Sequence, residues 1–472
     1  METIPQQPSL PPPPARLFCV GIGGIGVSAL AQLLVHLGYD VAGSDRGLDD
    51  PSKAHLYERL RRQGIRLHPQ DGSGVRAERP DALVISNAVE PGNPDLKAAS
   101  PDTPVIHRAR ALAQALDRTG TRQIAVAGSC GKTSVTGWLA AALRALGEPV
   151  ILVNGGYDLA AETPDFPGNF LADPAARFAV VEVDESDKSL VQFTPHYGVL
   201  LNVGNDHYSQ DELRQVFATF LGRCREGIAC LDELAGLADG CGVPLATFGP
   251  EPAPDVLAPL GYAASPDGIR FDAPLCGEGF HTTQSGRHSA LNACAVLALL
   301  RLLKLPQAQT PERLREAIAA FRGVRQRFEQ MGSRADGTPV INDYAHNPEK
   351  IAAALATARE RFGSPLTAVF QPHGFSALRN FRAQLRESLS ASLTTADTLI
   401  LLPVYYAGGT ATFSPTSDEV AAELRDGGLN AVALSREAAT RAIAAQAHPS
   451  CVIVMGARDP SLRDWSAQLA ST

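Results

Sequence analysis

Short apolar runs alternate along the chain with longer segments of helical pattern. The runs are rich in Val, Ile and Leu, and they cover residues 17–21, 82–86, 123–127, 178–183, 197–202, 366–370, 398–402 and 451–455. Because they do not alternate with polar residues, they are typical of parallel strands covered on both faces. The helical segments between them include residues 28–37, 134–146, 348–361 and 377–392. This alternation predicts an α/β protein.

Two interruptions of the pattern predict domain boundaries. The first lies near residues 116–120, before a fresh strand, and the second lies near residues 328–338, where GSRADGT precedes another strand. The length of 472 residues agrees with this division, since about 150 residues per domain gives roughly three domains. We expect domains over residues 15–118, 119–329 and 330–472, after a Pro-rich tail over residues 1–14 that we expect to be disordered.

Composition excludes several classes of protein. Lys and Arg number 42 against 50 Asp and Glu, a net charge of −8, so the basic surplus typical of nucleic-acid binders is missing. No apolar run reaches the roughly 18 residues of a membrane span, and the first residues lack the apolar core of a signal peptide. Eight scattered cysteines form no CxxC pair. We therefore expect a cytoplasmic protein that binds neither nucleic acid nor membrane.

A glycine-rich turn follows the first predicted strand and precedes the first predicted helix. Its glycines are Gly21, Gly23, Gly24 and Gly26. Such a turn lets the backbone approach a pyrophosphate, which the helix amino terminus then stabilises. The second strand ends in Ser44 and Asp45, and a carboxylate about twenty residues downstream is placed to meet a ribose. The alternative is a purely structural glycine turn, and the spacing does not distinguish a dinucleotide from a UDP-sugar.

A second glycine-rich loop lies between the strand at residues 123–127 and the following helix. It consists of Gly128, Ser129, Cys130, Gly131, Lys132, Thr133 and Ser134. Backbone N–H groups of such a loop cradle phosphates, while the Lys reaches the terminal phosphates and the Thr binds Mg²⁺. The pattern predicts ATP binding with Mg²⁺. Cys130 is either a small residue that fills the loop or a thiol activated by the helix amino terminus.

Acidic residues and a histidine end the next two predicted strands. EVDESD begins at Glu182, and NDH ends at His207. Carboxyl ends of parallel strands form the ligand-binding edge of open α/β sheets. Glu182 and His207 are therefore candidates to complete a Mg²⁺ shell begun by Thr133. The alternative is a solvated acidic turn.

Two further motifs follow strands in the last third of the chain. DYAHNP contains Asp343 and His346 and opens a helix, and Asp343 could simply cap that turn. FQPH ends at His373, with Arg379 a little further on. Polar groups at these strand ends indicate a third binding site.

Taken together, these motifs resemble those of the Mur ligase family, most closely its alanine-adding members, in the same order over about residues 16–470. The segments that carry the resemblance are GIGGIGVSALA (21–31), AGSD (42–45), ISNAVEPGNPDL (85–96), PVIHRARALAQAL (104–116), AVAGSCGKTS (125–134), EVDESD (182–187), NDH (205–207), SGRHSALNA (285–293), FRGVRQRF (321–328), DYAHNP (343–348) and FQPH (370–373).

The resemblance implies an ATP-dependent ligase that forms an amide through an acyl phosphate. It implies a Rossmann-like domain for the UDP-linked acid, a central P-loop-type ATPase domain with a parallel sheet, and a carboxyl-terminal α/β domain for the amine. Lys132, Glu182 and His207 would be catalytic. The nucleotide would contact the phosphate loop and Asn292, Arg327, Asp343 and His346. The acid and amine would contact the first glycine loop and Ser44, Asp45, Ser86, Asn87, His373 and Arg379.

Several positions depart from the family pattern. Ser129 and Cys130 replace the usual Thr-His, Ser289 replaces one Asn, and the segment 374–379 keeps Arg379 alone of three arginines. Since an Arg at a bidentate site has no equivalent substitute, the amine or the acid could differ from the family's usual substrates. Two weaker alternatives are a nucleotide-binding protein that has lost ligase activity and an NAD-dependent oxidoreductase. Some members of the family carry a carbamylated lysine. Lys188 follows EVDESD, but its register does not match that lysine.

Overall fold

The computed structural model describes residues 8–185, 189–204, 210–406, 412–446 and 448–472. The chain divides into two compact units. Unit 1 holds residues 1–262, 270–283 and 287–324, and unit 2 holds residues 263–269, 284–286 and 325–472. Unit 2 therefore takes two short pieces from the middle of the chain.

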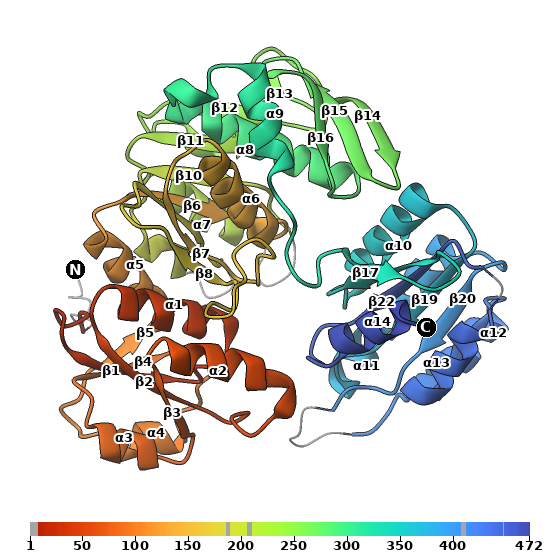
Figure 1. The fold of residues 1–472 in the computed structure, drawn as a ribbon, viewed down its shortest axis with the longest axis horizontal. Helices are drawn as coiled ribbons and strands as arrows, with labels where there is room; N and C mark the ends of the chain where they lie inside the picture. Colours follow the sequence, from red (N-terminus) through yellow and green to blue (C-terminus); the bar gives the residue numbers. More distant parts are fainter. Residues whose placement is uncertain (1–7, 186–188, 205–209, 407–411, 447) are drawn as a thin grey trace. The chain divides into compact units, whose positions relative to one another are not determined.

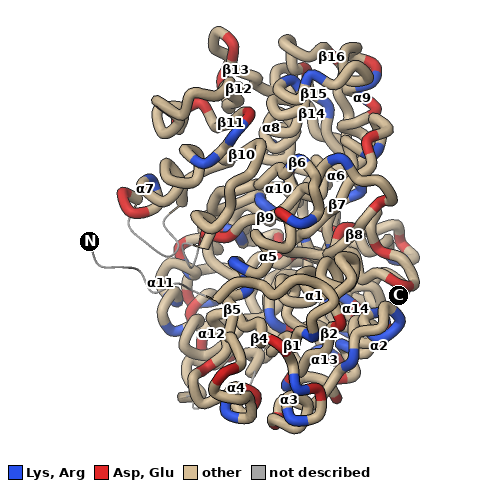
Figure 2. The backbone as a smooth tube through the Cα atoms, turned by 90° about the vertical axis from the view of Figure 1, so that its left-hand side faces the viewer, with Lys and Arg blue, Asp and Glu red and all other residues tan. Residues whose placement is uncertain are grey.

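Unit 1 begins with a five-stranded parallel sheet of order β3-β2-β1-β4-β5 (Figure 1). Its strands are β1 (Arg16–Val20), β2 (Asp40–Asp45), β3 (Arg66–Pro69), β4 (Ala82–Ile85) and β5 (Val105–His107). Its helices are α1 (Ile25–His36), α2 (Ala54–Arg62), α3 (Ser73–Glu78), α4 (Pro94–Ala98) and α5 (Arg108–Arg118). Acidic and basic residues are interspersed around α2 and α3 (Figure 2). This is the parallel sheet that the apolar runs predicted. Its central strands are buried on both faces, which is why their sequences are uninterrupted apolar runs.

The start of the described chain is held against α5. The Leu10 side chain is 2% exposed, and the Leu10 backbone N–H donates to Gln114 Oε1 at 2.6 Å. Arg118 donates to the carbonyls of Leu10 and Pro11, both at 2.6 Å. The predicted disorder of residues 1–14 is therefore wrong for residues 8–14; residues 1–7 lie outside the described residues. Leu10 supplies the apolar anchor that a count of prolines overlooks.

The rest of unit 1 contains an eight-stranded sheet of order β13-β12-β11-β10-β6-β9-β7-β8 and a three-stranded sheet of order β14-β15-β16. The first comprises β6 (Arg122–Ala127), β7 (Val150–Val153), β8 (Phe170–Ala172), β9 (Phe178–Glu182), β10 (Tyr197–Leu200), β11 (Gly227–Leu231), β12 (Leu245–Phe248) and β13 (Val256–Leu257). The second comprises β14 (Leu260–Ser265), which ends in unit 2, β15 (Gly268–Ala273) and β16 (Gly277–Thr282). The helices are α6 (Lys132–Ala145), α7 (Gln210–Leu221), α8 (Arg287–Leu303) and α9 (Pro311–Ala319).

Unit 2 is built on a six-stranded sheet of order β17-β18-β22-β19-β20-β21. Its strands are β17 (Glu329–Ser333), β18 (Pro339–Asp343), β19 (Leu366–Phe370), β20 (Thr398–Leu401), β21 (Ala431–Ala433) and β22 (Cys451–Met455). Its helices are α10 (Pro348–Phe362), α11 (Phe375–Ser392), α12 (Ser417–Asp426), α13 (Arg436–Ala444) and α14 (Leu462–Ala470). The only antiparallel pair among these strands is β17 with β18. The apolar core lies on both faces of the sheet, as the uninterrupted strand runs predict.

A piece from the middle of the chain is fastened to the unit 2 sheet. Arg361 of α10 donates to the carbonyl of Pro266 at 2.6 and 3.0 Å and to Ser285 Oγ at 2.7 Å. The same guanidinium donates to Gln330 of β17 at 3.2 Å. One arginine thus joins three separate stretches of sequence.

Candidate functional site

The first glycine loop joins β1 to α1 and is held by Asp45 at the end of β2. Asp45 Oδ2 accepts the N–H of Gly23 at 2.8 Å, and Oδ1 accepts the N–H of Gly47 at 2.8 Å and the hydroxyl of Tyr57 at 2.9 Å. A Cβ at Gly23 would lie 2.6 Å from the Tyr57 hydroxyl, so this position has room for glycine alone. Asp45 is 8% exposed. Its carboxylate therefore shapes the loop, whereas the sequence pattern predicted a direct contact with a ribose.

Ser44 lies deeper than we expected of a substrate-binding residue. Its side chain is fully buried, and its hydroxyl donates to the carboxylate of Asp95, whose other oxygen accepts the N–H of Gly72 at 2.8 Å. Successive side chains of a strand point to opposite faces of the sheet, so Ser44 shares the buried face of Ala42. In this structure Ser44 joins β2 to the segment that contains α4.

Residues that follow β4 and β5 lie on the same edge of the first sheet. Asn87 Oδ1 and His107 Nε2 are 3.0 Å apart, and the Ser86 carbonyl accepts the Val89 N–H at 3.0 Å. Arg108, the first residue of α5, was missed by the sequence analysis. Its guanidinium lies 3.0 Å from where a Cβ of Gly26 would be, directly beside the start of α1. A guanidinium beside a helix amino terminus is an arrangement that holds an anionic group.

The second glycine loop joins β6 to α6, and α6 begins at Lys132. Gly131 has a φ of +84°, in the left-handed region that favours glycine. Asn202, just after β10, fixes the loop: its side chain accepts the Cys130 N–H at 2.8 Å and donates to the Cys130 carbonyl at 3.0 Å. Ser129 Oγ accepts the Gly204 N–H at 2.8 Å. The structure thus gives Ser129 and Asn202 roles in shaping a phosphate cradle.

Lys132 forms an ion pair inside this site. Its Nζ lies 2.6 Å from Glu185 Oε2, and the two side chains are 13% and 6% exposed. Glu185 belongs to the EVDESD segment but was not singled out by the sequence. This carboxylate neutralises the lysine charge in a largely buried position.

Glu182 and Thr133 each lie against one of two adjacent glycines after β7. The Gly155 N–H donates to Glu182 Oε2 at 2.9 Å, and a Cβ at Gly155 would lie 2.5 Å from that oxygen. A Cβ at Gly156 would lie 2.7 Å from Thr133 Cγ2. The sequence analysis did not single out this NGG segment. Here they leave room for the Glu182 and Thr133 side chains.

The oxygens of Thr133 and Glu182 suit Mg²⁺, which prefers hard oxygen ligands and keeps waters and phosphate oxygens in its shell. Within the described ranges, no group of three or more His, Cys, Asp or Glu side chains is arranged to hold a metal by itself. His207, predicted as a third ligand, lies outside the described residues, as does Lys188.

Asn292 reaches the same loop from α8. A Cβ at Gly131 would lie 3.1 Å from Asn292 Oδ1, so the amide borders the phosphate cradle. Ser289, one turn earlier, is 7% exposed. The loop, Lys132, Thr133, Glu182 and Asn292 are thus gathered within unit 1.

The remaining predicted residues lie in unit 2, where two motifs meet. Both Asp343 oxygens accept backbone N–H groups at 2.7 Å, from Phe328 and from Ala345, and burial raises the pKa of this carboxyl. Arg327 lies over the Tyr344 ring with its guanidinium carbon 4.9 Å from the centroid. Asp343 therefore holds together the two segments from which Arg327 and DYAHNP project.

His346 and His373 lie edge to face, with ring centroids 5.0 Å apart. Nδ1 of His346 lies 2.9 Å from the Tyr344 carbonyl, so it carries the proton. His373 stacks on Phe381, and its Nδ1 is buried with no hydrogen-bond partner among the described residues. Burial, together with the charges of His346 and Arg458, lowers the pKa of His373 to about 4. His373 is consequently a neutral imidazole near pH 7.

Arg379 is committed to the backbone in this structure. Its Nη2 donates to the carbonyls of Thr412 and Ser414 at 3.2 and 2.7 Å. Beside it, the Phe413 ring meets the rings of Phe375 and Tyr406 with centroids 5.2 and 5.3 Å apart. Phe413 is 60% exposed and Tyr406 45%. Aromatic rings thus occupy the surface next to the segment from which two arginines of the family pattern are missing.

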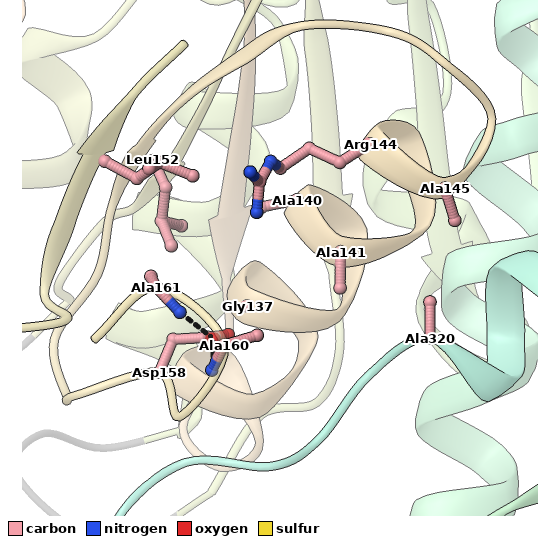
Figure 3. Close-up of a pocket in the computed structure, with 11 residues that line it drawn as sticks. Gly137, Ala140, Ala141, Arg144, Ala145, Leu152, Asp158, Ala160, Ala161 and Ala320 are labelled. Carbon is pink, nitrogen blue, oxygen red and sulfur yellow. Dashed lines mark hydrogen bonds between the residues drawn. The ribbon is translucent and has the colours of Figure 1, made fainter. Parts of the chain in front are cut away.

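A cavity of about 200 Å³ lies between α6 and the segment after β7 (Figure 3). Alanines and Gly137 make up most of its wall, with Arg144 and Asp158 as its charged members. Asp158 Oδ1 accepts the N–H groups of Ala160 and Ala161 at 2.8 and 3.1 Å. Burial raises the pKa of Asp158 to about 6. This carboxyl fixes the turn at residues 158–161 rather than facing a phosphate site.

Comparison with known proteins identifies a matching family and several relatives of this chain. Three family models match: Mur ligase family, catalytic domain (residues 17–119); Mur ligase middle domain (126–300); and Mur ligase, glutamate ligase domain (326–458). UDP-N-acetylmuramate–L-alanine ligases of Streptomyces avermitilis and an Anaeromyxobacter species are 33% and 32% identical. They cover 96% and 94% of this chain and 96% and 95% of their own.

Solved structures agree with these matches. The structure of UDP-N-acetylmuramate–alanine ligase from Thermotoga maritima has a TM-score of 0.76 at 26% identity, and the match covers 96% of this chain and 97% of that one. A murein peptide ligase from Psychrobacter arcticus shares the fold, with a TM-score of 0.64 at 21% identity over 96% and 98% of the two chains.

Proposed function

The chain belongs to the Mur ligase family, and from this premise we propose that it joins the carboxylate of UDP-N-acetylmuramate to the amino group of L-alanine. It is an ATP-dependent, amide-forming ligase of the kind that acts in peptidoglycan synthesis, as the sequence motifs predicted. The observation that carries the proposal is the phosphate loop at the end of β6 with Glu182 at the end of the adjoining β9, in a chain 33% identical to such ligases over 96% of its length.

A free carboxylate is a poor electrophile until one of its oxygens becomes a leaving group. In the proposed reaction the acid attacks the γ-phosphate of ATP and forms an acyl phosphate with release of ADP. The amine then attacks the acyl carbon, and the tetrahedral intermediate collapses to the amide and inorganic phosphate. Lys132 would leave Glu185 and stabilise charge on the transferred phosphoryl group, which is the main contribution a protein makes to such a step.

Thr133 and Glu182 would hold Mg²⁺ on this side of the site, together with His207, the third ligand that the sequence predicts. The ion would neutralise phosphate charge when bound. The Gly155 N–H orients the Glu182 carboxylate by donating to Oε2.

The first glycine loop would receive the pyrophosphate of the UDP-linked acid. The amino terminus of α1 and the Arg108 guanidinium supply positive potential there, and Asp45 holds the loop in shape. We assign residues 15–118 to the UDP-linked acid, 119–329 to ATP and 330–472 to the amine. By resemblance to the family, Arg327, Asp343 and His346 would also contact the nucleotide. No described helix is long and apolar enough to span a membrane.

The test is release of phosphate from ATP and Mg²⁺ with UDP-N-acetylmuramate present and L-alanine added or omitted. Release that requires both substrates, with the amide product identified by mass spectrometry, is the expected result. Absence of release both with and without L-alanine would overturn the assigned acid, and a panel of other UDP-linked acids would then be tested in its place.

A second candidate differs only in the amine. The aromatic rings of Phe375, Tyr406 and Phe413, beside an Arg379 already bound to backbone carbonyls, favour an amino acid with an apolar side chain larger than a methyl group. Comparing kcat/KM for L-alanine, L-leucine and L-phenylalanine separates the candidates. Phe413→Ala should lower kcat/KM for the larger amines selectively, and equal values for all three amines in both proteins would remove this candidate.

A further inference from the structure

The segment between β7 and β8 is closed by two buried asparagines. The N–H of Asn154 donates to the carbonyl of Asn169 at 2.9 Å, and the two side chains are 2% and 0% exposed. Asn154 directly follows β7, and Asn169 directly precedes β8, which pairs antiparallel with β7. This pairing fixes the two backbone positions side by side, so the two side chains project from the same fixed part of the backbone.

The Asn154 side chain contacts the ATP side of unit 1. Its Nδ2 donates to the carbonyl of Thr133, in the first turn of α6, at 3.1 Å. The next residue, Gly155, donates to Glu182. Asn154 thus holds the turn that carries the candidate Mg²⁺ ligand Thr133.

The Asn169 side chain contacts the first turn of α1, 144 residues away in the sequence. Its Nδ2 donates to the carbonyl of Ile25 and to Ser28 Oγ, both at 2.8 Å, and its Oδ1 accepts from Gln32 Nε2 at 3.0 Å. Ser28 and Gln32 are at most 1% exposed. A buried polar network whose members are all paired is rigid and specific, so Asn169 sets the position of this helix end.

The structure assigns Asn154 and Asn169 as positioning residues that join the two phosphate-binding helices. Asn169 orients the start of α1 for the pyrophosphate of the UDP-linked acid, and Asn154 orients the start of α6 for the phosphates of ATP; this inference rests on the proposed function for the identity of both ligands. Because one backbone pair links both helix ends, binding at one site tightens binding at the other, and the coupling is reciprocal.

The inference is tested by calorimetric titration of the full chain with UDP-N-acetylmuramate and with UDP, each with and without a non-hydrolysable ATP analogue and Mg²⁺. Asn169→Ala removes the contact with α1. Ser28→Ala removes one partner of Asn169 in a nearly isosteric way. Arg62→Ala is the matched control, since Arg62 joins α2 to the same segment through the exposed carbonyl of Pro164 at 2.9 Å.

In the wild type, the analogue should strengthen binding of the UDP-linked acid several-fold. Asn169→Ala should weaken that binding about tenfold and abolish the strengthening, with the affinity for the ATP analogue alone within twofold of wild type. Ser28→Ala should fall between, and Arg62→Ala should match the wild type. Thermal unfolding confirms that each variant is folded. If the role of Asn169 were merely structural, the melting temperature would fall, but the affinity for the UDP-linked acid would not fall more than the affinity for the ATP analogue.

Binding of the UDP compounds by Asn169→Ala and Ser28→Ala as tightly as by Arg62→Ala would overturn the inference. If the wild type binds UDP but not its acid, the proposed acid is wrong, and the same comparison with UDP decides the inference. If the wild type binds neither, the glycine loop is not a site for a UDP compound, and the bridge between two phosphate sites is rejected.

Discussion

Asp45 Oδ2 accepts the backbone N–H of Gly23 at 2.8 Å, so the carboxylate at the end of β2 is part of the glycine loop it was expected to assist. The same side chain also binds the Gly47 N–H and the Tyr57 hydroxyl. Substrate binding in the first sheet therefore depends on Asp45 through the shape of the loop.

Replacing Asp45 by Asn should weaken binding of the UDP-linked acid and leave ATP binding unchanged. The amide cannot accept on both sides, so a buried N–H loses its partner at a cost of about 1–3 kcal/mol, equivalent to roughly 5- to 150-fold in affinity. Separate titrations with the two ligands measure this. Equal weakening of both affinities would contradict the role given to Asp45.

Replacing Lys132 by Ala should lower the rate of phosphate release by about 10²-fold or more, because a charge aimed at the transferred phosphoryl group is lost. Glu185→Gln is the matched control: it removes the ion pair at 2.6 Å but leaves the ammonium. Its turnover should stay much nearer to wild type. Comparable losses in both variants would show that the pair itself, rather than the lysine, is required.

Replacing Glu182 by Ala should raise the Mg²⁺ concentration needed for half-maximal phosphate release, because one oxygen ligand is removed. Gly155→Ala should have a similar effect, since its Cβ would lie 2.5 Å from the Glu182 carboxylate oxygen. Magnesium titrations at saturating ATP measure both. An unchanged titration for Glu182→Ala would remove this residue from the metal site.

Asp158 should make the protein less stable as the pH rises. Burial raises its folded-state pKa from 3.8 to about 6, so the folded state binds more protons than the unfolded state between these values. The free energy of unfolding then falls through that window by at most about 3 kcal/mol and is constant above it.

Asp158→Asn tests this, because its Oδ1 can still accept the Ala160 and Ala161 N–H groups. Relative to wild type, the variant should gain more in melting temperature at pH 8 than at pH 4.5. Asp165→Asn, which changes an exposed carboxylate in the same segment, should show no such difference. A gain independent of pH would mean that Asp158 ionises normally.

The α/β class and the Mur ligase resemblance were predictable from sequence and are confirmed. Strands such as β6 and β19 agree with their predicted ranges to within one residue, because buried parallel strands form uninterrupted apolar runs. The phosphate loop could likewise be found because its chemistry is contiguous in the sequence.

The parts that sequence did not yield depend on contacts between distant residues. Asn169 and Ile25 are 144 positions apart, and no local pattern marks either as a partner of the other. Arg108 stood in a helical segment whose spacing carries no sign of its proximity to Gly26. The NGG segment follows β7, an apolar run that was not among the predicted strands, so its glycines were not placed at the ligand-binding edge of a sheet.

The way Arg361 gathers Pro266, Ser285 and Gln330 limits how this protein can be divided. A gene fragment starting at residue 325 would encode the six-stranded sheet but omit residues 263–269 and 284–286, which complete unit 2. The Arg361 guanidinium would then lose three of its four hydrogen bonds. The fragment would also expose surface that these two pieces cover in the intact chain. Complementation by two separately expressed fragments therefore calls for a break elsewhere, with both central pieces kept on the same polypeptide as the carboxyl-terminal sheet.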